Sequence, residues 1–168
     1  MSIAESILPE YDQEMASTRK MLELVPVDKL DWAPHPKSMK LGSLATHIEG
    51  FPDWGLTTLK QDALDIGGEY TPYVITTIPA LLEKFDKEVA ATRELVSRTS
   101  DEEFGKTWTL TAGGATLFAM PKIAVWRGMV MNHMVHHRAQ LGVYFRLLDI
   151  PLPGIYGPSG DEMAKSKP

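Results

Sequence analysis

The chain has 168 residues, of which 43% are hydrophobic and 23% charged, a composition typical of one globular domain spanning residues 1–168. Its 22 acidic and 17 basic residues give a formal net charge of −5, and this charge argues against nucleic-acid binding because a phosphate backbone would be repelled. The absence of cysteine excludes disulfides, thiolate nucleophiles and cysteine-ligated zinc, and leaves histidine and carboxylate as the strong metal-binding side chains.

The first segment is helical in pattern. Apolar residues recur at steps of three and four from Ile3 to Val25, and Pro26 ends the predicted helix. Three prolines within residues 25–39 then predict a long ordered loop. The segment begins without a basic start or a long apolar run, and nowhere does the chain approach the roughly 18 apolar residues of a membrane span. We therefore expect a cytoplasmic protein without membrane contact.

A second helix is expected after this loop, with Ser43 as its cap. His47 falls within its apolar stripe, which is an unusual position for histidine. Gly50 and Pro52 interrupt the pattern, so this segment is either one kinked helix or two abutting helices that end before residues 66–68.

The second half of the chain continues the helical pattern. A third helix is predicted from about Ile78 to Val96, and residues 108–121 predict a loop or a short hairpin around Gly-Gly. The last helix is expected to begin near Pro121. The proline- and glycine-rich residues 149–168 predict an irregular C-terminal tail. Together these segments predict an all-α four-helix bundle.

Two histidines share the buried face of the last helix. His133 and His137 are four residues apart, so their imidazoles lie about 40° apart around the helix and about 6 Å apart along it and can meet on one ion. With His47 they would form a three-histidine site that leaves coordination positions open for water or substrate. The alternative is that each imidazole simply hydrogen-bonds a carbonyl in the core or at its rim.

The neighbouring polar residues are assigned other roles. Met134 stands where zinc proteases of the H-E-x-x-H type carry their general-base glutamate, which argues against proteolysis. His136 is rotated about 100° from His137 and is expected behind the ligands or at the surface. The loop residue His35 is interpreted as a packing or capping residue. No catalytic base is identified.

The sequence resembles the DinB superfamily. The similarity lies in LGSLATHIEG, in the Pro-rich HPKSM, and in NHMVHHRAQLGVYFRLLDIPLPGIYGPSGDE, and it covers nearly the whole chain. It implies a DinB-type four-helix bundle that binds one divalent metal through one histidine of the second helix and two of the last, here His47, His133 and His137. It also implies homodimerisation. Zinc or nickel is the expected ion, although imidazole also suits iron and copper.

The resemblance further implies a class of function. The family name reflects damage-inducible expression, and characterised relatives include transferases and isomerases that use low-molecular-weight thiols. The leading hypothesis is therefore a metal-dependent thiol transferase or isomerase in which the ion activates a thiol or water, a chemistry that would also suit a hydrolase. Its partners would be a small-molecule thiol and an electrophilic substrate. The alternative is a non-catalytic metal-binding stress-response bundle without a substrate-sized cavity beside the ion.

Overall fold

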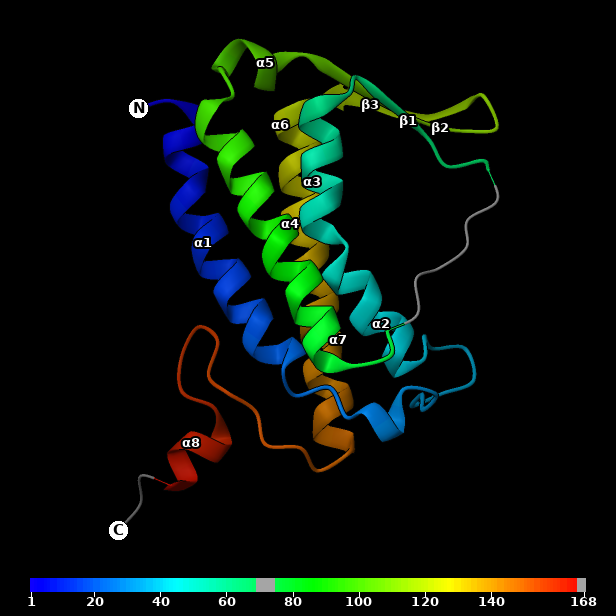
Figure 1. Cartoon of the computed structure of the whole chain (residues 1–168), viewed down its shortest axis with the longest axis vertical. Coiled ribbons are helices and arrows are strands. Elements are labelled where there is room, and N and C mark those ends of the chain that lie inside the picture. The colour runs from blue at the N-terminus through cyan, green and yellow to red at the C-terminus, as the bar shows by residue number, and fades with distance from the viewer. Residues whose placement is uncertain (69–74, 166–168) are drawn as a thin grey trace.

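The structure, a computed structural model, describes residues 1–68 and 75–165 and is mostly helical (Figure 1). In chain order its elements are α1 (Ile3–Leu22), the 3₁₀ turn η1 (Val27–Lys29), α2 (Leu41–Glu49), α3 (Phe51–Lys60), β1 (Ala63–Asp65), α4 (Ile78–Arg98), α5 (Asp101–Gly105), β2 (Thr107–Ala112), β3 (Ala115–Pro121), α6 (Lys122–Val125), the π-helical segment η2 (Trp126–Asn132), α7 (His133–Leu147) and α8 (Gly160–Lys165).

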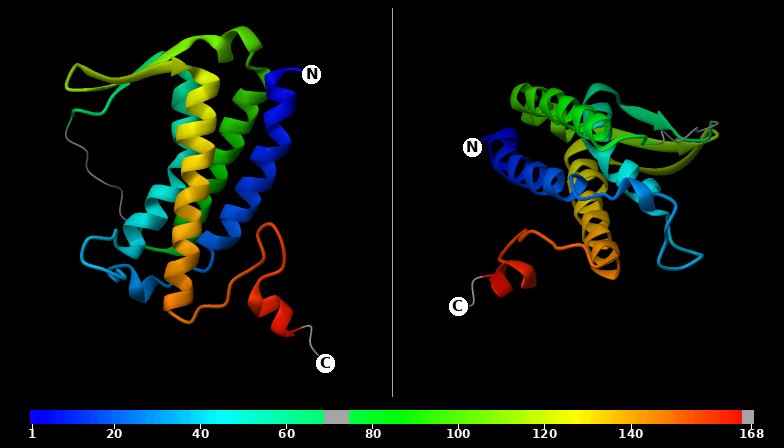
Figure 2. Two further views of the ribbon diagram at one scale, coloured as in Figure 1. Left: turned by 180° about the vertical axis from the view of Figure 1, so that it is seen from behind. Right: turned by 60° about the horizontal axis from the view of Figure 1, so that its bottom comes forward.

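The long helices pack side by side around one main core. Helix α1 lies against α4 and α7, α3 lies against α4, and α2 lies against α7 (Figures 1 and 2). Each helix contributes fully buried apolar side chains, among them Tyr11, Leu44, Phe85 and Phe145. Burial of side chains of this size supplies most of the driving force for such an arrangement.

The first helix and the loop after it follow the prediction. Ser2 and Glu5 form a capping box at the start of α1, because the hydroxyl accepts from the Glu5 amide and the Glu5 carboxylate accepts from the Ser2 amide. The helix ends at Leu22, four residues before Pro26. Residues 23–40 form the long loop, which contains only η1.

The predicted cap of the second helix is wrong. Helix α2 begins at Leu41 with Lys40 at the N-cap position, so Ser43 lies inside its first turn. No side-chain cap is present because the loop satisfies the first amides. The amide of Leu41 donates to the Trp32 carbonyl (2.8 Å), and the amide of Gly42 donates to the Leu30 carbonyl (2.9 Å).

The pattern break at Gly50 divides the segment into two abutting helices. Gly50 is at once the C-cap of α2 and the N-cap of α3, and Pro52 occupies the first turn of α3, where it needs no hydrogen-bond partner. This was one of the two alternatives left open by the sequence.

A small sheet corrects the all-α prediction, which holds only in the sense that the structure is mostly helical. Strands β2 and β3 form a hairpin, one of the two alternatives left open for this segment, with Gly113 and Gly114 at positive φ in its turn, and β1 pairs parallel to β2. Asp65, at the end of β1, connects this strand to the hairpin, since its carboxylate accepts from the amides of Gly113 and Gly114 and from the Thr111 hydroxyl.

The last helix is continuous but not uniform. From α6 through η2 to α7 the chain forms one long rod (Figure 2), in which residues 126–132 make the wider π-helical turns. Nothing in the residue pattern predicts this segment. π-Helical turns are frequent next to functional sites, and here they lead directly into His133.

The irregular tail is only partly as predicted. Residues 149–159 are irregular, but α8 follows, capped by Ser159, whose hydroxyl accepts from the Glu162 amide while the Glu162 carboxylate accepts from the Ser159 amide. Residues 166–168 of the predicted tail lie outside the described residues. Within the described ranges, no helix has both the length and the apolar character needed to cross a membrane.

Candidate metal centre

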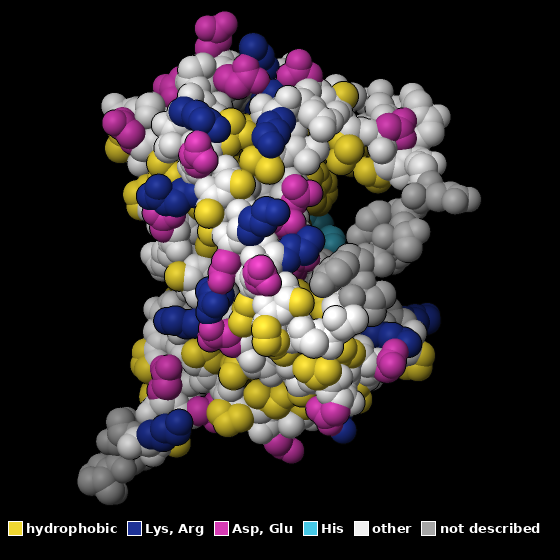
Figure 3. All heavy atoms as spheres, viewed as in Figure 1, with side chains coloured by type: hydrophobic (Ala, Val, Ile, Leu, Met, Phe, Trp, Pro, Cys, Tyr) yellow, Lys and Arg dark blue, Asp and Glu magenta, His cyan; other side chains and the backbone are white. Residues whose placement is uncertain are grey.

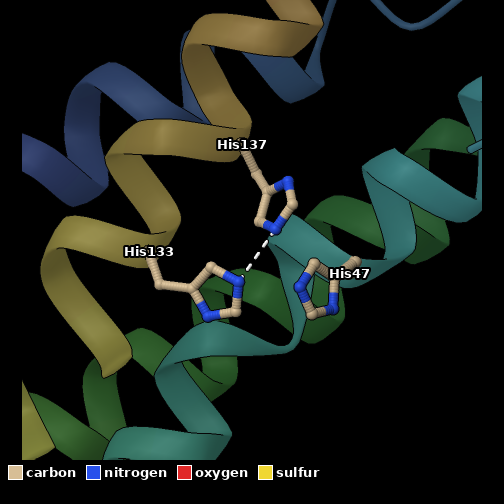
Figure 4. Close-up of side chains that lie close together, drawn as sticks. All are labelled: His47, His133 and His137. Atoms are coloured by element: carbon tan, nitrogen blue, oxygen red, sulfur yellow. Dashed lines mark hydrogen bonds between the residues drawn. The ribbon is translucent and has the colours of Figure 1, made fainter. Parts of the chain in front are cut away.

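The three histidines predicted from the sequence converge between α2 and α7 (Figure 4). Each offers a ring nitrogen, and these nitrogens all lie within 4.8 Å of one another. The Nε2 atoms of His133 and His137 face each other at 2.9 Å, while the His47 ring centroid lies 5.3 Å from that of His133 and 4.6 Å from that of His137. All three side chains are half-buried.

The donor set fits a divalent cation. Tetrahedral ligation at about 2.0–2.1 Å brings neighbouring ligand nitrogens to within about 3.4 Å, and the nitrogens of His133 and His137 are already this close. Two facing Nε2 atoms can share only one proton, whereas a cation accepts both lone pairs. Three imidazoles also suit zinc, nickel, copper or iron better than the hard cations that prefer oxygen.

Burial keeps the imidazoles in the form that binds metal. It lowers the pKa of His47 to about 4, with smaller contributions from the nearby His137 and His133. Burial also lowers the pKa of His133, and the nearby His137 lowers it further, while the Met129 carbonyl has a smaller opposite effect. Burial likewise lowers the pKa of His137, and the hydrogen bond with Gln140 partly offsets this. At neutral pH the site therefore presents uncharged rings with free lone pairs.

Gln140 orients His137, a role that was not predicted from the sequence. The side-chain oxygen of Gln140 lies 2.8 Å from His137 Nδ1, and its side-chain nitrogen lies 3.0 Å from His136 Nε2. An amide oxygen only accepts, so His137 carries its proton on Nδ1 and leaves Nε2 free to face His133. His136 thus stands behind the ligands at the surface, as expected. The i, i+3 spacing of His137 and Gln140 was the signal available in the sequence.

Aromatic rings form the floor of the site. The Phe51 ring centroid lies 4.9 Å from that of His47 and 4.8 Å from that of His133, and the Trp54 ring lies 6.0 Å from His133. Both aromatic residues lie at the start of α3, Phe51 directly after Gly50 and Trp54 three residues further on. They restrict the histidine rings and keep water from one side of the nitrogens, which strengthens electrostatic interactions there.

A cavity of about 720 Å³ opens beside His47. One wall is formed by residues 46–57 of α2 and α3, and the other by residues 64–68 of β1 and the turn that follows. In the space-filling view a histidine side chain is visible in a hollow at the edge of α4 (Figure 3). The volume is within the roughly 300–1,000 Å³ typical of small-molecule sites.

The other polar candidates lie outside this centre. His35 is exposed in the loop, where its Nδ1 accepts from the Lys37 amide (3.1 Å), which is the capping role predicted for it. Arg138 is buried on another face of α7 and pairs with Glu14 (2.5 Å) and with the Tyr156 hydroxyl of the tail (2.9 Å). Its role is therefore to hold the tail and α1 against α7.

Comparison with known proteins supports the family resemblance. The model of the DinB superfamily matches residues 10–141, a range that includes all three histidines. A DinB-like protein from Bacillus cereus ATCC 10987, known from its crystal structure, is 26% identical, with a TM-score of 0.70 over 92% of this chain and 98% of that one. A DinB-like protein from Bacillus subtilis is 17% identical and alike in fold, with a TM-score of 0.66 over 92% and 99%. No curated protein matches.

Proposed function

Because this chain belongs to the DinB superfamily and gathers three uncharged imidazoles beside a cavity, we propose that it is a metal-dependent enzyme of the thiol-transferase or isomerase type. His47, His133 and His137 would hold one divalent ion, zinc or nickel in the first instance. In this proposal α1, α2 with α3, α4 and α7 are the helices of a DinB-type four-helix bundle. The cytoplasm, where small thiols are kept reduced, is the compartment that fits such an activity.

In this proposal the ion and the residues around it would have separate roles. A bound cation would supply a Lewis acid that lowers the pKa of a thiol or water. The three imidazoles carry no charge to cancel that of the cation, which leaves it a strong attractor for a thiolate. Gln140 holds the His137 ring in register, and Phe51 and Trp54 exclude water from one side of the nitrogens. Since the chain has no cysteine, the thiol would come from a small molecule.

The observation that carries this proposal is the cavity of about 720 Å³ that shares His47 with the cluster. The alternative, a non-catalytic bundle in which the ion only braces α2 against α7, requires a metal but no space for a substrate. A substrate-sized cavity next to open coordination positions favours the enzyme.

Metal analysis tests the first half of the proposal. Protein purified without a chelator or a histidine tag should contain about one equivalent of a divalent metal, and the His133→Ala variant should lose it. The matched control is His136→Ala, which removes a histidine three residues away that is not a member of the three-histidine cluster. Equal metal content in the wild type and His133→Ala would refute the site.

A conjugation screen tests the second half. Metal-loaded protein is offered a panel of low-molecular-weight thiols with several electrophiles, and loss of free thiol is followed over time. Turnover that disappears in His133→Ala and persists in His136→Ala would support the enzyme. Inactivity with every pair, in protein that retains its metal, would favour the non-catalytic alternative.

A further inference from the structure

We infer that the cavity beside the histidines selects its ligand by charge. The geometry points to a thiol with an apolar or aromatic body whose far end is cationic, and it disfavours a far end that carries a carboxylate. This inference rests on the proposed function, because the sulfur is taken to be the end of the ligand that meets the ion.

The body of the ligand is indicated by the walls of the cavity. Phe51 and Trp54 line one wall, with their rings stacked at 6.3 Å between centroids and 19° between planes. Leu64 of β1 and Ile66, which follows the strand, line the opposite wall, and Ile66 is 52% exposed. A flat apolar group placed between these walls would cover all four side chains and remove them from water.

The charge of the far end is indicated by the ionisable residues of the cavity. Among the described residues that line it, the only ionisable side chains are His47, Asp53 and Asp65, and there is no lysine or arginine. A carboxylate in the ligand would therefore meet two carboxylates and no lysine or arginine along these walls, whereas an ammonium group would be attracted.

The two carboxylates differ in how far their oxygens are already engaged. Asp65 accepts hydrogen bonds from the Thr111 hydroxyl and from the amides of Gly67, Gly113 and Gly114, at 2.7–3.0 Å. Its charge contributes to the field of the cavity, but its oxygens are occupied by the chain itself. Asp53 is exposed in the first turn of α3, and within residues 1–68 and 75–165 nothing donates a hydrogen bond to it or pairs with it. Asp53 is therefore the group that we assign to the ligand's cationic end.

A matched series of thiols tests this assignment by binding rather than by turnover. The protein is loaded with cobalt(II), whose near-ultraviolet thiolate-to-metal band reports sulfur at the ion. It is then titrated with 4-(mercaptomethyl)benzylamine, 4-methylbenzyl mercaptan and 4-(mercaptomethyl)benzoic acid, which share the same thiol and ring. We expect the amine to bind about fivefold more tightly than the acid, with the neutral thiol between them, as an exposed charge pair would give.

The variants locate the effect. Asp53→Asn should move the ratio of the amine and acid dissociation constants towards one without changing cobalt content, and the charge of Asp65 accounts for any preference that is left. The control Glu102→Gln removes the same charge from exposed α5, far along the chain from the cavity walls, and should leave the ratio at its wild-type value. Circular dichroism checks that both variants fold like the wild type.

The outcomes separate this inference from the function on which it rests. If the acid binds as tightly as the amine, or if Asp53→Asn keeps the wild-type ratio, the charge selection is refuted while thiol binding at the ion stands. If none of the three thiols produces the thiolate band in cobalt-loaded protein, thiol binding at the ion is refuted, and the charge selection falls with it.

Discussion

Replacement of Gln140 by leucine should weaken metal binding without removing any ligand. In the wild type the Gln140 oxygen accepts from His137 Nδ1 at 2.8 Å, which holds the proton away from Nε2 and sets the angle of the ring. Leucine has a similar volume but no acceptor. His137 would then be free to rotate or to carry its proton on Nε2, and either change must be reversed before an ion can bind.

The size of the effect follows from the surroundings of this hydrogen bond. Loss of a partner behind a metal ligand costs about 10- to 100-fold in affinity, or roughly 1.4–2.7 kcal/mol. Gln140 is only half-buried, and its other partner, His136, is exposed, so water can replace part of the lost bond. We therefore expect the loss of zinc affinity to be at the lower end of this range, about tenfold.

Competition with a chromogenic chelator measures this change directly as a dissociation constant for zinc. Gln140→Glu keeps an acceptor at the same position and should bind zinc at least as tightly as the wild type. His136→Ala removes only the outer partner and should change the constant by less than Gln140→Leu does. Wild-type affinity in Gln140→Leu would refute the role assigned to this side chain.

Three further predictions concern stability. The metal-free protein should lose stability as the pH falls from about 6.5 towards 4, because the folded state keeps His47 unprotonated, with its pKa at about 4, while the unfolded chain takes up the proton. Urea unfolding across this range should give a flatter pH dependence for His47→Phe, and an unchanged slope would contradict the burial argument. Gly55→Ala should cost about 1–3 kcal/mol in urea unfolding, because a Cβ atom there would lie 2.8 Å from the buried Trp126 ring. Arg138→Met should cost about 3–5 kcal/mol by leaving the Glu14 carboxylate buried without its partner. The double variant with Glu14→Gln should recover part of that loss, and strict additivity in this double-mutant cycle would show that the two side chains are not coupled.

The features of this structure that could be predicted from the sequence are those determined by residues close together in the chain. Helical periodicity located the long helices to within a few residues, and the i, i+4 spacing placed His133 and His137 on one face. The family resemblance, together with its place in an apolar stripe, pointed to His47 as the third member of the cluster. Local signals were also overlooked, since Ser159 and Glu162 have the spacing of the capping box that they form at α8.

The parts that were missed depend on residues far apart in the chain. Strand β1 has three residues and no pattern of its own, and it exists because β2 and the Asp65 carboxylate hold it against a hairpin turn more than 45 residues away. The start of α2 is likewise set by carbonyls of the preceding loop, which made Ser43 unnecessary as a cap. The cavity was missed for the same reason, because one of its walls is formed by α2 and α3 and the other by β1 and the residues after it.

Because Asp65 is hydrogen-bonded to the hairpin turn, the shape of the outer cavity wall can change independently of metal binding by the histidines. The histidines lie on helices of the main core, whereas Leu64 and Ile66 flank Asp65, whose carboxylate accepts from the amides of Gly113 and Gly114. Substitutions or insertions in that turn would shift the outer wall and leave the ligand nitrogens where they are. A laboratory selection for new substrates could therefore vary residues 111–116 at little risk to metal binding, and the hairpin is the place to begin engineering this scaffold.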